Sequence, residues 1–177
     1  LAVVNVTSGP GGLNTLTGVM GQWTDSVPVL YISGQVKKET TINSCPNIGL
    51  RQLGDQEVDI ISIIKPITKF AVSVKNPKDI RNLLEKALHI ATSGRPGPVW
   101  LDIPLDFQWA SIDPDTLPTF DPQTLSTETS FDTSKLHKQV GTLCELLGAA
   151  KRPLIVLGYG VRLGHAEELF RQFIDKF

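Results

Sequence analysis

Residues 93–106, with the sequence SGRPGPVWLDIPLD, constrain the fold of this chain more than any other stretch. A helical pattern precedes the stretch, and Gly94 supplies the backbone freedom that a helix C-terminus often uses. Two prolines follow closely and prevent the helix from continuing. Residues 98–103 are then apolar apart from Asp102, which is typical of a short buried strand. The stretch therefore predicts a helix, a rigid turn and a strand in immediate succession.

Strands and helices are predicted to alternate along the rest of the chain. Apolar runs predict further strands at residues 1–6, 27–33, 69–74 and 153–157, and periodic apolar positions predict helices at about 13–23, 58–64, 76–92, 136–147 and 166–177. The run at 1–6 is nearly continuous, so we expect it to be buried on both faces of a parallel sheet. Alternation of this kind predicts an α/β fold, with parallel sheets covered by helices on both faces.

A segment rich in Pro, Ser, Thr and Asp, residues 113–134, separates two such regions. We expect a first domain at 1–110, a linker at 111–133 and the beginning of a second, Rossmann-like α/β domain at 134–177. The chain starts directly in a predicted strand and ends within a helical pattern. From these ends we expect the chain to be a part of a longer polypeptide.

The composition excludes several classes of function. The 177 residues include 17 Lys and Arg against 18 Asp and Glu, so no excess of positive charge indicates nucleic acid as a partner. No apolar run reaches the roughly 18–20 residues that span a bilayer, which predicts no membrane partner. Cys45 and Cys144 are far apart and lack metal-ligand spacing, so they favour a reduced, cytoplasmic setting without a zinc site.

The glycine-rich turn at residues 7–12, TSGPGG, follows a predicted strand and precedes a predicted helix. This order is typical of a phosphate site at a helix N-terminus. However, Pro10 has no N–H to donate, and no Lys or Arg precedes Lys37. The turn therefore favours a small, neutral heteroaromatic ligand over a pyrophosphate, unless its glycines serve only to reverse the chain.

Two further features could serve function. The segment at 36–54 is longer than an ordinary connection and is followed by a polar patch at Gln52, Asp55, Gln56 and Glu57, which indicates a segment that is either functional or mobile. Arg95 lies in the rigid turn before a strand, where it could meet a ligand or a neighbouring domain. The alternatives for Arg95 are that it binds helix carbonyls or is only solvated.

Several motifs together resemble one family. They are TSGPGG with Asn14, DSVP, GQV, DQE, ITKF, ATSGRPGPVWLDIP and KRPLIVLGYG, in this order along nearly the whole chain. The set resembles the thiamine-diphosphate-dependent enzymes of the acetolactate synthase type, which act in branched-chain amino acid biosynthesis. The resemblance implies that residues 1–110 are the later part of a pyrimidine-binding domain and residues 134–177 the beginning of a central domain.

The resemblance also implies roles for single residues. Pro10 and Asn14 match the turn that approaches the aminopyrimidine of thiamine diphosphate. Gln56 matches a glutamine that reaches the active site beside this cofactor, so it is expected to have both a catalytic and a cofactor-binding role.

Further matches concern a second cofactor. Ser26, Arg95 and the turn from Gly158 to Gly160 match positions that contact FAD in family members that carry it. Magnesium is implied as well, but its ligands and the glutamate that activates thiamine diphosphate match nothing in these residues. We therefore expect the 177 residues alone to be inactive, and the whole protein to form a homodimer or homotetramer.

The chain departs from the family pattern at two positions. Asp55 stands where acetolactate synthases commonly have Phe, and Leu105 where they commonly have Lys. The resemblance implies a carboligase that decarboxylates a 2-oxo acid substrate, and Asp55 favours an acceptor that is more polar or larger than a second pyruvate. The alternatives are a simple 2-oxo acid or oxalyl-CoA decarboxylase, and a non-catalytic nucleotide-binding module.

Overall fold

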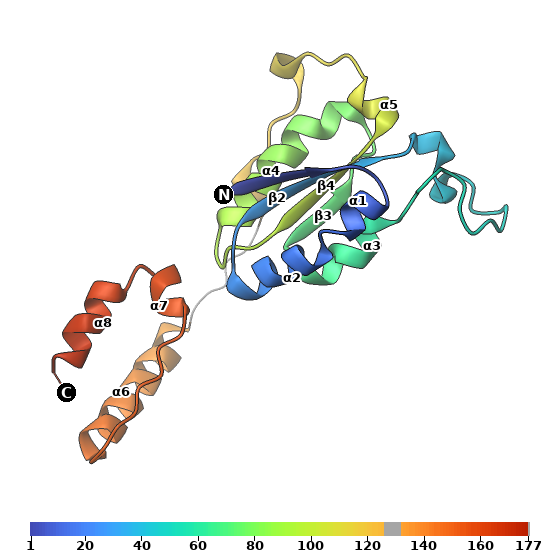
Figure 1. The fold of residues 1–177 in the computed structure, drawn as a ribbon. Helices are drawn as coiled ribbons and strands as arrows, with labels where there is room; N and C mark the ends of the chain where they lie inside the picture. Colours follow the sequence, from blue (N-terminus) through green and yellow to red (C-terminus); the bar gives the residue numbers. More distant parts are fainter. Residues whose placement is uncertain (126–131, 177) are drawn as a thin grey trace. The chain divides into compact units, whose positions relative to one another are not determined.

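The computed structural model of the protein describes residues 1–125 and 132–176. They divide into two compact units, one formed by Leu1–Leu125 and the other by residues of Ser126–Phe177 (Figure 1). The first unit contains the sheet, and the second consists of helices and irregular segments.

A parallel sheet of four strands is the centre of the first unit. Its strands are β1 (Ala2–Val6), β2 (Val29–Gln35), β3 (Phe70–Ser73) and β4 (Val99–Pro104), in the spatial order β1-β2-β4-β3. Every neighbouring pair is parallel. The predicted parallel α/β fold is confirmed, and the carboxyl ends of all four strands meet at one edge of the sheet.

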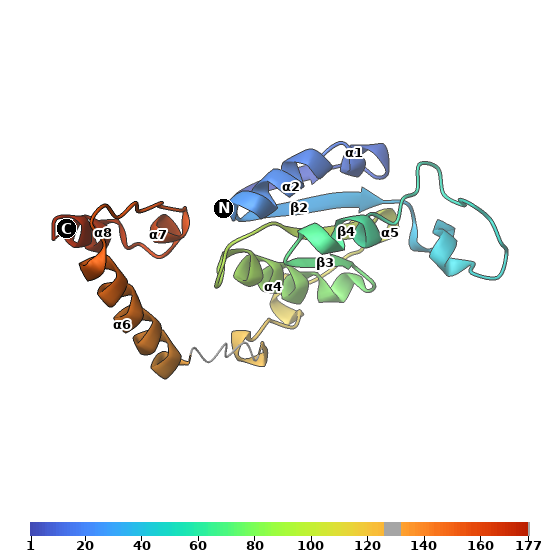
Figure 2. The ribbon, with the colours of Figure 1, turned by 90° about the horizontal axis from the view of Figure 1, so that it is seen from below.

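Helices cover both faces of the sheet (Figures 1 and 2). The helices α1 (Pro10–Leu13), α2 (Leu16–Asp25) and α3 (Ile60–Ile64) lie on one face, and α4 (Ile80–Thr92) lies on the other. Side chains from alternate strand positions enter two apolar clusters. Trp100 packs with α2 and α3, whereas Val99 and Leu101 pack with Ala87 and Ala91 of α4. This alternation is the period of two that a strand imposes on its side chains.

Short elements complete the first unit. The helix α5 (Leu105–Gln108) follows β4 directly. Single turns of 3-10 helix occur at η1 (Lys38–Thr40), η2 (Ile42–Ser44), η3 (Lys65–Ile67), η4 (Pro77–Asp79), η5 (Pro114–Thr116) and η6 (Pro122–Thr124).

Two details of the first unit differ from the sequence predictions. The single helix expected at 13–23 is two helices, because the chain ends α1 at Leu13 and begins α2 at Leu16, where the Thr15 hydroxyl binds the Gly12 carbonyl at 2.7 Å. The burial expected for residues 1–6 is wrong, since Val3 is 60% exposed. The reason is that β1 has only β2 as a neighbour among the described strands.

The segment predicted to begin the linker packs on α4. Two side chains of α4 donate hydrogen bonds to the backbone of this segment: Arg81 Nη1 to the Pro114 carbonyl at 2.9 Å and Asn82 Nδ2 to the Thr119 carbonyl at 2.8 Å. Residues 111–125 therefore belong to the first compact unit. The part of the predicted linker at 126–131 lies outside the described residues.

The second unit contains α6 (Thr133–Ala149), α7 (Gly160–Leu163) and α8 (Glu167–Ile174). The strand predicted at 153–157 is wrong, because Leu154 and Val156 are 88% and 86% exposed in a segment without regular structure. A strand needs a hydrogen-bonded neighbour, and no other strand is present among the described residues of this unit. In the described part of the chain, no helix has the length and apolar character needed to cross a membrane.

Candidate active site

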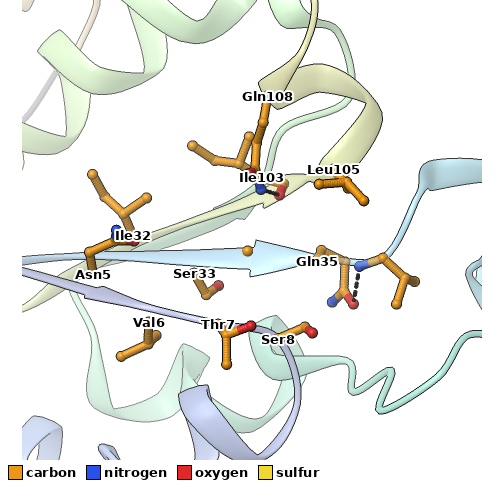
Figure 3. A pocket seen from close by; sticks show the side chains of 12 residues that line it. Asn5, Val6, Thr7, Ser8, Ile32, Ser33, Gln35, Ile103, Leu105 and Gln108 are labelled. Atoms are coloured by element: carbon orange, nitrogen blue, oxygen red, sulfur yellow. Dashed lines mark hydrogen bonds between the residues drawn. The ribbon is translucent and has the colours of Figure 1, made fainter.

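A cavity of about 650 Å³ lies at the carboxyl edge of the sheet (Figure 3). It is lined by residues at the ends of three strands, β1, β2 and β4: among them Thr7, Ser8, Ser33, Gln35, Ile103 and Leu105. Leu105, one of the two departures from the family pattern, thus contributes to the wall of the cavity. Ligands of open parallel sheets bind at this edge, outside the carboxyl ends of the strands.

A second cavity, of about 630 Å³, shares Gln35 with the first. Its other walls come from β3, β4, α3 and the segment between β2 and α3, and they carry Lys38, Glu57, Lys75 and Asp102. Both cavities therefore border the carboxyl edge of the sheet. The side chain of Gln35 forms part of the boundary between them.

Buried hydrogen bonds fix the side chains at this boundary. Ser33 Oγ donates to Asp102 Oδ1 at 2.6 Å, and Trp100 Nε1 donates to Ser33 Oγ at 2.8 Å. Gln35 Nε2 donates to Asp102 Oδ2 at 3.3 Å and to the Val58 carbonyl at 2.9 Å. The register that pairs Ser33 with Asp102 brings these groups together.

Burial dominates the electrostatics of Asp102, which is only 2% exposed. Loss of hydration disfavours the charged carboxylate and raises its pKa, and the hydrogen bonds from Ser33, Gln35 and Ser73 oppose this rise. One feature of the sequence indicated this group, because Asp102 interrupts an otherwise apolar strand. Its partners Ser33 and Gln35 were missed, since their proximity depends on strand register.

The glycine-rich turn meets Gln56 at the same edge. Gly9 has φ +54°, and a Cβ placed on it would lie 2.0 Å from the backbone oxygen of Gln56. Gln56 itself has φ +56°. Pro10 occupies the first turn of α1, and the backbone N–H of Asn14 donates to the Pro10 carbonyl at 3.0 Å. The structure thus brings together the turn and the glutamine that the sequence singled out.

The side chains of Pro10, Asn14 and Gln56 are all exposed. Neither amide, of Asn14 or of Gln56, makes a side-chain hydrogen bond with another described residue. Asp55 is also exposed but lines neither cavity. The roles of these residues toward a cofactor remain predictions.

Ser26 and Arg95 form a pair at the opposite edge, before the first residues of β2 and β4. Arg95 Nε donates to Ser26 Oγ at 2.7 Å, and Ser26 is a buried residue with φ +58° at the end of α2. The carbonyls at the end of α4 are bound instead by Lys69 Nζ, which donates to those of Ile90 and Ser93. Partial burial lowers the pKa of Lys69. Arg95 is therefore paired with a hydroxyl rather than with these carbonyls.

Gly158 and Gly160 lie in the second unit. Gly160 begins α7, and its carbonyl accepts from the Gly164 N–H at 2.9 Å. Both glycines are exposed, and no described atom lies within 4 Å of a Cβ placed on either. Their proposed contact with FAD stays a prediction.

Residues 1–125 and 132–176 contain no group of three or more His, Cys, Asp and Glu side chains that could hold a metal ion. Where the site carries charge, single groups such as Lys38, Glu57 and Lys75 supply it. Beside these charged groups, the edge carries amides, hydroxyls and the buried carboxyl group of Asp102. Such groups bind and orient a ligand that brings its own reactivity.

A match to a known domain family indicates the class of protein. Residues 1–63 match the family described as the thiamine pyrophosphate enzyme, N-terminal TPP binding domain. This match includes β1, the glycine-rich turn, β2, Gln56 and most of α3. The matched residues thus include the glycine-rich turn and Gln56, which meet at the carboxyl edge of the sheet.

Longer matches narrow the class. The chain is 36% identical over 169 residues to the glyoxylate carboligase of Escherichia coli O157:H7, covering 96% of this chain and 26% of that protein. It is 32% identical over 178 residues to the acetolactate synthase large subunit of Lactococcus lactis subsp. lactis (strain IL1403), covering 100% of this chain and 28% of the relative. It is 34% identical over 177 residues to the acetolactate synthase isozyme 3 large subunit of E. coli K12, covering 99% and 29%.

The predicted resemblance is thus confirmed: residues 1–63 match the N-terminal domain of thiamine pyrophosphate enzymes, and nearly the whole chain is similar to large subunits of acetolactate synthases. The chain spans between 26% and 29% of the length of these three relatives. Two of the names denote acetolactate synthases and one a carboligase that acts on glyoxylate, so a thiamine-diphosphate-dependent carboligase family is supported.

Proposed function

We propose that this chain supplies the pyrimidine side of a thiamine-diphosphate site in a carboligase that decarboxylates a 2-oxo acid. One observation carries the proposal: Gly9 of the turn lies against the backbone of Gln56, so that Pro10, Asn14 and Gln56 occupy one edge of the sheet. Two segments more than forty residues apart in sequence meet there. The family match supports the choice of cofactor.

The residues at this edge fit an aminopyrimidine ring. Such a ring is neutral and needs hydrogen-bonding partners rather than a cation, and residues 1–36 contain neither Lys nor Arg. The exposed amides of Asn14 and Gln56 can each donate and accept. Pro10 offers an apolar surface without an N–H. When bound, thiamine diphosphate would supply the chemistry that releases carbon dioxide from the acid, while these residues bind the ring and orient it.

The acceptor is proposed to be more polar or larger than a second pyruvate. Leu105 lines the 650 Å³ cavity at a position where the family commonly has Lys, and the exposed carboxylate of Asp55 adjoins Gln56. A change from a cation to an alkyl group removes the attraction for a second carboxylate. The same two departures support the alternative of a simple 2-oxo acid or oxalyl-CoA decarboxylase.

Two further cofactors and an assembly are part of the proposal. FAD is proposed to contact Ser26, Arg95, Gly158 and Gly160, and the side chain of Arg95 is exposed beyond its single bond to Ser26. Magnesium would be held outside these residues. A homodimer or homotetramer in the cytoplasm is proposed from the family resemblance.

The whole protein that contains these residues, purified and supplied with thiamine diphosphate and magnesium, tests the proposal. We expect consumption of pyruvate or glyoxylate and a ligated product that NMR identifies, with kcat/KM at least tenfold lower for Gln56→Ala, a loss of about 1.4 kcal/mol in transition-state stabilisation. Gln123→Ala is the matched control, because Gln123 is exposed in η6. A product of decarboxylation alone would favour the alternative, and no turnover of any 2-oxo acid would refute the proposal.

A further inference from the structure

One carboxylate, that of Glu57, closes the segment between β2 and α3 by holding its two halves together. Glu57 Oε1 accepts from the backbone N–H of Ile42 at 2.6 Å, and Oε2 accepts from those of Gly54 at 3.1 Å and Leu53 at 3.4 Å. Backbone donors from both halves of the segment thus converge on a single side chain. Hydrogen bonds to an ionised acceptor are stronger than neutral ones.

A glycine closes the segment at a second point. A Cβ on Gly54 would lie 2.7 Å from Val36 Cγ2 and 2.9 Å from the Thr40 carbonyl oxygen, so only a glycine permits this approach. Figures 1 and 2 show the segment projecting from the carboxyl edge of the sheet. Its two ends are consequently held together while its middle extends away from the sheet.

Gln56 lies between the two closing residues in sequence. Its φ of +56° is uncommon for a residue with a side chain and persists only where the surroundings enforce it. The Gly54 and Glu57 contacts hold the backbone on either side, and Gly9 packs against its carbonyl oxygen. The orientation of Gln56 therefore depends on the closure of the segment.

We propose that Glu57 is a positioning residue, whose carboxylate closes the segment at 36–57 and thereby presents Gln56 to the Gly9–Pro10 turn. The proposal rests on the function proposed for Gln56. Glu57 acts through Gln56 and not as an acid or base, because its two oxygens are occupied by backbone N–H groups. In Glu57→Gln, the side chain could accept through one atom only, which would leave one side of the closure without an acceptor.

The test compares four variants of the whole protein that contains these residues: Glu57→Gln, Gln56→Ala, the double variant and Glu39→Gln. Glu39 is the matched control, because it is an exposed carboxylate in the same segment without a side-chain hydrogen bond to the described residues. We expect Glu57→Gln to lower kcat/KM at least fivefold, Glu39→Gln to change it less than twofold, and the double variant to equal Gln56→Ala. Equality in the double variant would show that the two residues act as one unit.

Hydrogen exchange of backbone amides provides a readout that does not need catalysis. The amides of Ile42, Leu53 and Gly54 should exchange faster in Glu57→Gln and remain protected in Glu39→Gln. Gly54→Ala provides a second way to open the segment, and it should reproduce both the faster exchange and the lower kcat/KM.

The outcomes separate the two proposals. Unchanged exchange in Glu57→Gln would overturn the closure, and additive losses of kcat/KM in the double variant would overturn positioning through Gln56. Faster exchange with full activity in Glu57→Gln, while Gln56→Ala is impaired, would overturn positioning but leave the proposed function intact. Full activity in Gln56→Ala would overturn the role of Gln56 and, with it, positioning through Gln56, whereas exchange would still report the closure.

Discussion

The contact between Gly9 and Gln56 makes a direct test of the site possible through Gly9→Ala. The new Cβ would lie 2.0 Å from the Gln56 backbone oxygen, whereas ordinary contacts lie at 3.4–4 Å. At least one of the two segments must therefore move by more than an ångström. The variant changes no polar group, so any loss of function reports this displacement.

The size of the effect of Gly9→Ala follows from two unfavourable free energies, one of backbone conformation and one of crowding. The positive φ of Gly9 is unfavourable for alanine by about 1–3 kcal/mol, and crowding of a packed site adds about 1–3 kcal/mol. A displacement of 1 Å can lower a reaction rate by about 10²-fold when it affects a positioning residue. We therefore expect a loss of about 10- to 100-fold in kcat/KM and weaker binding of thiamine diphosphate.

Gly94→Ala is the matched control for this experiment. Gly94 has φ +57°, close to the +54° of Gly9, but no described atom lies within 4 Å of a Cβ placed on it. Thermal unfolding with and without thiamine diphosphate should show a loss of stability in both variants and a loss of ligand-induced stabilisation only in Gly9→Ala. Equal cofactor affinity and equal kcat/KM in the two variants would refute the reasoning.

Three other substitutions test the fold around the site. Burial raises the pKa of Asp102, so the folded protein binds this proton more strongly than the unfolded chain does, and the free energy of unfolding of the wild type should fall as the pH rises above 3.8, the ordinary pKa of Asp. In Asp102→Asn this fall should be absent from urea unfolding. Parallel pH profiles for variant and wild type would contradict this. Trp100→Ala should destabilise the protein by about 3–5 kcal/mol in the same urea assay, since Trp100 is fully buried, and a loss below about 1 kcal/mol would show that the core can collapse around it. Lys69→Met should cost about 1 kcal/mol through loss of its two hydrogen bonds at the end of α4, and faster hydrogen exchange of that last turn checks the cause.

Much of the first unit could be predicted from its sequence because local patterns decide it. The apolar run at 98–103 becomes β4, and the periodic apolar positions after Pro77 become α4. The turn at Gly94 has the positive φ that its glycine predicted. These elements depend on neighbours within a few residues, which the sequence displays directly.

The predictions that were wrong concern neighbours distant in sequence. An apolar run cannot tell how many strands lie beside it, so β1 was expected to be buried but lies at an edge. The run at 153–157 has the composition of a strand but lacks a partner among the described residues. The break between α1 and α2 is the exception, because it is local: the Thr15 hydroxyl bonds to the Gly12 carbonyl three residues earlier.

The candidate site shows the same limit. Motifs indicated Pro10, Asn14 and Gln56 separately, and the structure adds the contact between Gly9 and Gln56. The approach of Ser26 to Arg95 and the bonds of Asp102 depend on which strands are adjacent. Glu57 could be noticed only as one member of a polar patch, because its three partners are backbone groups that no side-chain pattern displays.

The stacking of Tyr31 on Trp100 makes the fluorescence of Trp100 a probe of its surroundings. The two rings are parallel within 3° at a centroid distance of 4.8 Å, so light absorbed by Tyr31 passes to the neighbouring indole. That indole is shielded from water and donates to Ser33, whose hydroxyl binds Asp102. Trp23 and Trp109, at 39% and 83% exposure, emit from wetter surroundings and can be quenched from solution. We expect the fluorescence that survives such quenching to respond to the protonation of Asp102, a carboxyl group that solvent hardly reaches.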